Sequence, residues 1–255
     1  MPTKTKTFYD DPTYNYKKYW QGREYEDQSE RIALKKLFAL ISRKNTILDV
    51  GGGFGRLTPE YVGLFKKCLL VDPSKKLLAE AEKLCGQYKN LSVKQGFIEK
   101  LPNNERKYDV AITVRTFHHL KNLPLAIKNI SQTIKPNGFI ILEFANKIRF
   151  KSLIKAVFNL NFDFFTSHVP LDISYKKGVV PFISYHPNQI KTLLLANKFT
   201  IIKILSVSNF RHSLFKALLP LNFLLKIESF FSSAFSFIPF IRFFGPSIFI
   251  LAKKN

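Results

Sequence analysis

The stretch that most constrains the fold is residues 46–57, TILDVGGGFGRL. The short apolar run 47–50 predicts a buried strand, and it leads directly into glycines. Glycines let the backbone turn sharply and approach a ligand closely. Residues 57–62 then open a helical pattern in which Pro59 suits the first turn. Strand, glycine loop and helix in this order form the unit that holds a nucleotide at the carboxyl end of an open α/β sheet.

The spacing of the glycines indicates which nucleotide. A dinucleotide fingerprint, G-x-G-x-x-G, needs a third glycine where this chain has Arg56, and the Gly-Lys-Ser/Thr end of a Walker loop is absent. An acidic residue is instead followed by glycines at alternate positions: Asp49, Gly51, Gly53 and Gly55. This pattern resembles motif I of the class I S-adenosylmethionine-dependent methyltransferases. The resemblance implies that the loop faces the methionine moiety and ribose of that cofactor.

A second strand is predicted at residues 68–72, and it too ends in an acid, Asp72. A carboxylate can accept hydrogen bonds from two neighbouring ribose hydroxyls, which is the role of the acid at this place in the fold. The alternative is that Asp72 caps the helix predicted from Ser74 to Leu84, after Pro73. Gly86 follows that helix as a C-cap glycine would.

The third and fourth strands are predicted at residues 91–95 and 108–114. The segment 96–102, GFIEKLP, resembles the Gly-Asp-Ala-Glu-x-Leu-Pro loop of small-molecule methyltransferases, but Phe97 replaces the acid that accepts from the adenine amino group. Phe97 can stack on or enclose the base, and the amino group then needs a carbonyl or water. Residues 115–120, RTFHHL, resemble the strand-four exit of the family, which borders cofactor and acceptor. The resemblance also assigns Pro73, Ile98, Val114 and Arg115 to the cofactor.

The remaining pattern completes an α/β fold. A helix at 123–134 precedes the turn KPNG and a fifth strand from Phe139, and a helix at 188–196 precedes strands at 199–205 and 246–252. We therefore predict a Rossmann-like, seven-stranded, mostly parallel sheet with helices on both faces, plus an apolar helical insertion at about 209–245 before the last strand. The predicted division is an N-terminal lid or arm (1–28) and one methyltransferase domain (29–255), with a cofactor half (29–145) and an acceptor half (146–255).

The insertion has three interpretations. Its longest uncharged run, residues 229–241, is 13 residues long, whereas a membrane-spanning helix needs about 20. It could cap a hydrophobic acceptor pocket, lie on anionic lipid as an interfacial helix, or form a buried hairpin or dimer face.

The N-terminal segment is unusually aromatic, with Tyr9, Tyr14, Tyr16, Tyr19, Trp20 and Tyr25. It is predicted either to fold over the cofactor as a lid, with Arg23 offered to a carboxylate, or to act as a packing arm. His119 is the candidate general base, because it leaves strand four beside the glycine loop. The candidate acceptor-lining residues are Tyr19, His118, Tyr185 and His186.

Charge and cysteine content bear on partners. The formal net charge is +22, from 40 basic and 18 acidic residues. The excess of positive charge favours nucleic acid or anionic lipid as a binding partner. A compositional bias of the source genome explains the excess equally well. The two cysteines, Cys68 and Cys85, lack a zinc-like spacing, so no metal is expected. No signal peptide is recognised, which predicts a cytoplasmic location. A location at the periphery of the membrane is the alternative.

The predicted function is methyl transfer from S-adenosylmethionine to a small, hydrophobic or lipid-like acceptor, with S-adenosylhomocysteine as product. Positioning alone can contribute ~7–11 kcal/mol, so O-, C- and N-methylation all stay open, as does the oligomeric state. A nucleic-acid methyltransferase is the first alternative. Residues 114–117, VRTF, stand where such enzymes carry Asp/Asn-Pro-Pro-Tyr/Phe, which argues against it. The second alternative, supported by Phe97, is a non-catalytic relative that binds a membrane surface.

Overall fold

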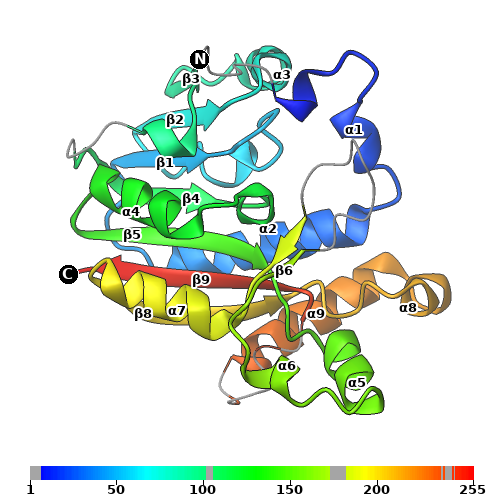
Figure 1. Ribbon diagram of the computed structural model, residues 1–255. Coiled ribbons are helices and arrows are strands. Elements are labelled where there is room, and N and C mark those ends of the chain that lie inside the picture. Colours follow the sequence, from blue (N-terminus) through cyan, green and yellow to red (C-terminus); the bar gives the residue numbers. More distant parts are fainter. Residues whose placement is uncertain (1–6, 102–105, 173–181, 237, 239–242, 244) are drawn as a thin grey trace.

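The computed structural model describes residues 7–101, 106–172, 182–236, 238, 243 and 245–255 (Figure 1). A seven-stranded sheet runs through the molecule, with helices on both faces. The strands of this sheet are β1 (Thr46–Val50), β2 (Lys67–Asp72), β3 (Leu91–Gln95), β4 (Tyr108–Thr113), β5 (Ile134–Ala145), β8 (Phe199–Val207) and β9 (Ser247–Lys254).

The strand order is β3-β2-β1-β4-β5-β9-β8. β1 pairs in parallel with β2 and β4, and β4 in parallel with β5, whereas β9 is antiparallel to both of its neighbours. β5 and β8 therefore run in the same direction, and the carboxyl ends of six strands meet at one edge. The predicted fold class is confirmed.

Helices cover the sheet because their apolar positions recur at helical spacing. On one face lie α4 (Leu123–Thr133) and α7 (Pro187–Ala196), which share a core with the sheet. On the other lies α2 (Glu24–Ala39), which buries Ala33, Leu34, Leu37 and Phe38 against β1, β4 and β5. α3 (Lys75–Cys85) packs on β2 and β3, and begins where Ser74 Oγ accepts from the Leu77 N–H at 3.2 Å.

The helix predicted after the glycine loop is absent. Residues Thr58–Glu60 form only a 3-10 turn, and β2 begins seven residues after it, at Lys67. The tight turn places Tyr61 fully inside the protein, where its hydroxyl lies 3.1 Å from Thr58 Oγ1 and donates to Asp49 Oδ2 at 3.0 Å. A regular α-helix here would carry the Tyr61 side chain away from Asp49, so a buried polar contact decides the local conformation.

The predicted insertion before the last strand contains α8 (Ser213–Leu218) and α9 (Leu221–Phe235). α9 packs against α2 and β8 and buries Leu224 and Glu228. The Glu228 carboxylate accepts from the Tyr25 hydroxyl at 2.7 Å and from the Ser208 N–H at 2.8 Å, which ties α9 to α2 and to the end of β8. Residues 237, 239–242 and 244 of the predicted insertion lie outside the described residues.

Short elements gather around the carboxyl edge of the sheet. These are α1 (Tyr16–Tyr19), α5 (Phe150–Phe158), α6 (Asp163–Thr166) and the two-stranded pair β6 (Leu171–Asp172) and β7 (Ile183–Ser184). Over the part of the chain that the structure describes, no helix has the length and apolarity to cross a bilayer.

Candidate cofactor and acceptor site

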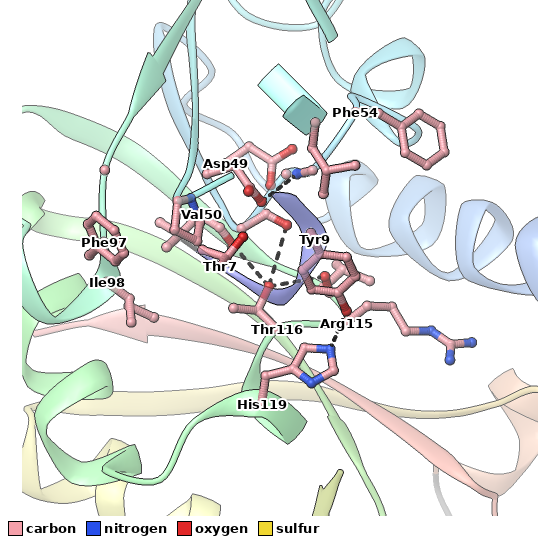
Figure 2. A pocket seen from close by; sticks show the side chains of 18 of the residues that line it. Thr7, Tyr9, Asp49, Val50, Phe54, Phe97, Ile98, Arg115, Thr116 and His119 are labelled. Atoms are coloured by element: carbon pink, nitrogen blue, oxygen red, sulfur yellow. Dashed lines mark hydrogen bonds between the residues drawn. The ribbon is translucent and has the colours of Figure 1, made fainter. Parts of the chain in front are cut away.

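A cavity of about 320 Å³ lies at the carboxyl edge of the sheet (Figure 2). Its walls come from the ends of β1, β2, β3 and β4 and from the N-terminal segment around Thr7, Tyr9 and Tyr16. A volume of this size is within the range of small-molecule sites. Segments that are far apart in the sequence therefore meet at the place where open α/β sheets bind ligands.

The glycine loop forms the floor because side chains do not fit there. Gly51 has a φ of +76°, and a Cβ at this residue would lie 2.2 Å from Thr116 Oγ1. Gly53 also has a positive φ, +56°, so its conformation requires glycine although space remains around it. Both glycines line the cavity. Gly55 does not; a Cβ there would lie 2.8 Å from Cys85 Sγ, so this glycine lets the loop pack on α3.

Asp72 lies at the end of β2 and lines the cavity. Its Oδ2 accepts from the Gly53 N–H at 2.9 Å and its Oδ1 from the Ser74 N–H at 2.8 Å. Each oxygen has a further lone pair with which to accept a hydroxyl. Burial raises the pKa of the Asp72 carboxyl to about 6, against the two N–H groups that lower it. Ser74, not Asp72, supplies the side-chain cap of α3.

Asp49 is the second buried carboxylate of the site. It lies in β1 at 4% exposure, lines the cavity, and accepts from the Tyr61 hydroxyl. Burial raises the pKa of its carboxyl to about 7, and the negative charge of Asp72 adds to this effect. The cavity thus holds two acids at its base, and both are expensive to ionise without a ligand.

A buried ionic network supports the cavity from the side of α2. Glu30 is fully buried and pairs with both Arg56 and Arg115; the Arg115 Nε donates to its Oε1 at 2.6 Å. The Arg115 N–H donates to Glu143 Oε2 at 2.8 Å, with Arg115 held at a φ of 62°. Burial disfavours the charged form of Arg115, but Glu30 and Glu143 raise its pKa above the usual value. The side chain of Trp20 lies over the Arg56 guanidinium, 3.6 Å from the ring centroid.

The N-terminal segment closes the cavity from above. The Tyr9 hydroxyl lies 2.8 Å from His119 Nε2, across 110 residues of sequence, and the pair is drawn in Figure 2. The Tyr16 ring packs on Phe54 at 5.7 Å between centroids. Asp10 fastens the segment to α3, because its Oδ1 accepts from Ser74 Oγ at 2.8 Å and from the Lys76 N–H at 3.2 Å.

The structure brings most of the predicted site residues together. Ten of them line the cavity: Asp49, Gly51, Gly53, Asp72, Pro73, Phe97, Ile98, Val114, Arg115 and His119. Phe97 and Ile98 enter it from the loop after β3 (Figure 2).

The other predicted residues lie outside the cavity wall. Arg23 lies over the Tyr19 ring, 4.1 Å from its centroid, and neither lines the cavity. His118 is buried and stacks on Phe182, and burial together with His119 holds its pKa well below the usual value. The buried Tyr185 hydroxyl donates to the Leu120 carbonyl at 2.5 Å, and His186 Nδ1 accepts from the Asn188 N–H at the start of α7.

Several lining residues were missed in the sequence. Tyr9, Tyr16, Thr116 and Phe54 line the cavity, and so do Thr7, Phe8, Leu77 and Glu99. The aromatic composition of residues 1–28 indicated that tyrosines of this segment could cover the site. It did not distinguish Tyr9 and Tyr16, whose rings face the cavity, from the others. Among the residues that the structure describes, no cluster of three His, Cys, Asp or Glu side chains could hold a metal ion.

Comparison with known proteins agrees with this geometry. Residues 48–142 match the family described as "Methyltransferase domain". Malonyl-[acyl-carrier protein] O-methyltransferase of Halalkalibacterium halodurans is 33% identical over 100 residues, which are 37% of each chain. The ubiquinone biosynthesis O-methyltransferase of Rickettsia typhi is 32% identical over 108 residues, 42% of this chain and 43% of the relative. The chain thus matches less than half the length of these curated relatives.

The fold is shared more widely than the sequence. The crystal structure of magnesium protoporphyrin IX methyltransferase from Synechocystis PCC 6803, with bound S-adenosylhomocysteine, superposes with a TM-score of 0.59 at 15% identity. The alignment covers 97% of this chain and 91% of that one.

Sheet order, glycine loop and strand-end acids define a Rossmann-like nucleoside-binding protein. With the family match, they show that residues 48–142 form a methyltransferase domain like that of the class I S-adenosylmethionine-dependent methyltransferases. The match implies S-adenosylmethionine as the cofactor, and the residues present fit it: a glycine loop at Gly51 and Gly53 where side chains are disfavoured, and a held carboxylate at the end of β2.

Proposed function

We propose that the protein transfers a methyl group from S-adenosylmethionine to a small, hydrophobic acceptor. The observation that carries the proposal is the cavity itself. The held carboxylate of Asp72 lines it at the end of β2, and the Tyr9–His119 pair lines it at the exit of β4. The bound cofactor would supply the electrophilic methyl group on its sulfonium.

The chain's own residues would bind, orient and exclude water. Asp72 would accept the two ribose hydroxyls, since its oxygens are already fixed by the N–H groups of Gly53 and Ser74. Asp49 would place negative charge near the cationic end of the cofactor. Phe97 would cover the base, and the N-terminal segment would keep water from the methyl group.

The acceptor side would be formed by four residues that line the cavity: His119, Leu120, Tyr9 and Phe8. For a hydroxyl or phenol acceptor, His119 would take the proton, a step worth typically 10²–10⁴ in rate. The Tyr9 hydroxyl at 2.8 Å from Nε2 would fix the orientation of the ring. A hydrophobic acceptor agrees with the apolar and aromatic lining, and one relative acts in ubiquinone biosynthesis. We place the reaction in the cytoplasm, at or near a membrane surface.

Calorimetric titration tests the cofactor half of the proposal. S-adenosylmethionine and S-adenosylhomocysteine should bind the wild-type protein, and NAD should not. Asp72→Ala should weaken both adenosyl ligands about 100-fold, because two hydrogen bonds to a charged group are lost. The exposed Asp163→Ala serves as the control and should bind like the wild type. A well-folded wild-type protein without affinity for either adenosyl ligand would contradict the proposal.

A further inference from the structure

Helix α5 turns its apolar face toward solvent. Phe150, Ile154, Val157 and Phe158 recur at the spacing of one helical face, and they are 57%, 40%, 51% and 83% exposed. Only Ala156 of this helix is buried. Leu160 and Phe162, between α5 and α6, are 76% and 62% exposed. A surface helix of a globular protein normally presents its apolar face to the core, so this orientation is the reverse of the usual one.

Helix α8 has the same character. Leu214, Phe215 and Leu218 lie on one side of a short helix and are 62%, 43% and 76% exposed. α5 follows β5 and α8 follows β8, and since these strands run in the same direction, both helices extend from the same edge of the sheet (Figure 1).

We call the outward side chains of α5, of the segment between α5 and α6, and of α8 the exposed apolar surface. It consists of Phe150, Ile154, Val157, Phe158, Leu160, Phe162, Leu214, Phe215 and Leu218. Exposed apolar side chains gathered in this number at one edge of the sheet are typical of an interaction site.

The charges carried by these segments are mostly positive, although Lys216 of α8 pairs with Glu26 of α2. Residues 149–166 carry Arg149, Lys151 and Lys155 against one acid, Asp163. Residues 210–226 carry three basic residues and no acid. Lys151 and Lys155 are exposed on α5, one position along from Phe150 and Ile154. Apolar side chains flanked by lysine on short helices have the composition of interfacial segments that lie on anionic lipid.

We propose that the exposed apolar surface docks on an anionic phospholipid bilayer, with its phenylalanines inserted at the headgroup boundary and the flanking cations on the lipid phosphates. A second copy of the chain is the less suitable occupant, because a two-fold contact would bring the same excess of cations together. Docking is independent of methyl transfer. It would bring the carboxyl edge of the sheet, where the cavity lies, close to the membrane and so to lipid-soluble acceptors.

Co-sedimentation of the full chain with vesicles tests the proposal. The vesicles are phosphatidylcholine alone, or phosphatidylcholine with phosphatidylglycerol, at about 0.05 M and about 0.5 M NaCl. The wild type should bind the anionic vesicles, more weakly at high salt, and the neutral vesicles much less. Phe158→Asn/Phe162→Asn should reduce partitioning at least tenfold, since both rings are exposed in the free protein. Lys151→Gln/Lys155→Gln should reduce it roughly tenfold at low salt, and less at high salt.

Matched controls change the same chemistry elsewhere. Leu84→Asn/Leu195→Asn removes two apolar side chains that are 47% and 63% exposed, and Lys66→Gln/Lys67→Gln removes two exposed lysines near β2. Both should bind vesicles like the wild type. Absence of binding by the wild type, or equal losses in test and control variants, would overturn the proposal. The proposal would also be overturned if the wild type is a dimer that Phe158→Asn/Phe162→Asn converts to a monomer while vesicle binding stays unchanged. Cofactor titration of the same variants reports separately on the cavity.

Discussion

Two buried carboxylates at the base of the cavity show how binding competes with stability at single residues. Asp49 and Asp72 have pKa values raised to about 7 and about 6, chiefly by burial, whereas an unfolded chain holds them near 3.8. A raised acid pKa means that the folded state binds the proton more tightly than the unfolded state. Stability is therefore lost as the pH rises from the unfolded value to the folded one. At neutral pH the ligand-free protein bears this cost at both residues.

Asp49→Asn should therefore stabilise the ligand-free protein. Asparagine keeps an oxygen for the Tyr61 hydroxyl and removes the buried charge. A shift of about three pKa units corresponds to roughly 4 kcal/mol at pH 8, and to less than half of that at pH 5. Urea unfolding at the two pH values measures the gain. A variant that is less stable than the wild type at pH 8 would mean that the carboxylate has a compensating partner.

The cofactor affinity should fall as the solution is acidified through about pH 6. Asp72 accepts hydrogen bonds from hydroxyls best as a carboxylate, and its pKa in the free protein is about 6. Below this pH each unit should weaken binding of S-adenosylhomocysteine by up to tenfold, whereas the contribution of Asp72 to the affinity should level off above pH 7. Asp72→Asn is the control. It should bind S-adenosylhomocysteine more weakly, and its affinity should depend less on pH in this range. A wild-type profile that is flat from pH 5 to 8 would exclude Asp72 as the group that titrates.

At the level of elements, Asp10 is one of the side chains that anchor the N-terminal segment. Asp10 ties the N-terminal segment to Ser74 and to the start of α3. Asp10→Ala should speed release of S-adenosylhomocysteine roughly fivefold, which is the effect of losing one or two ordinary hydrogen bonds. Stopped-flow displacement measures the rate, with Asp163→Ala as the exposed control. An unchanged rate would show that the aromatic contacts of Tyr9 and Tyr16 hold the segment without Asp10.

The strand-end part of the site was predictable from sequence because of parallel topology. Asp49, Asp72 and His119 each follow or end a short apolar run, and parallel strands bring their carboxyl ends to one edge. The sheet and the helices α3, α4 and α7 were also predictable, because their apolar periodicity is strong.

What could not be predicted depends on contacts between distant parts of the chain. Tyr9 reaches His119 across 110 residues, and no local pattern distinguishes it from the other tyrosines. The short turn after the glycine loop is set by the buried contact of Tyr61 with Asp49. The outward face of α5 has the same periodicity as an inward one, since spacing indicates a helical stripe but not the side on which it is buried.

On the scale of the whole molecule, charge is the property to test. The formal charge of +22 leaves many cations without a nearby acid, and their mutual repulsion opposes the compact state. Raising NaCl from about 0.01 M to about 0.1 M shortens the screening length from about 30 Å to about 10 Å. The unfolding temperature should therefore rise by a few degrees over this range. The buried pairs of Glu30 with Arg56 and Arg115 are screened much less, so they should not offset the gain.

A charge-deleted variant separates repulsion from other effects of salt. Lys66→Gln/Lys67→Gln should melt above the wild type at about 0.01 M NaCl, and the difference should shrink at about 0.1 M because the same repulsion is then screened. A neutral osmolyte such as sucrose should raise the unfolding temperature of both proteins equally. If salt instead lowers the wild-type unfolding temperature, partly exposed ion pairs such as Arg31–Glu60 and Arg56–Asp27 would outweigh the repulsion. The basic excess would then be held by local pairing, and the low-salt affinity for anionic vesicles would have to come from exposed lysines such as Lys151 and Lys155 of α5.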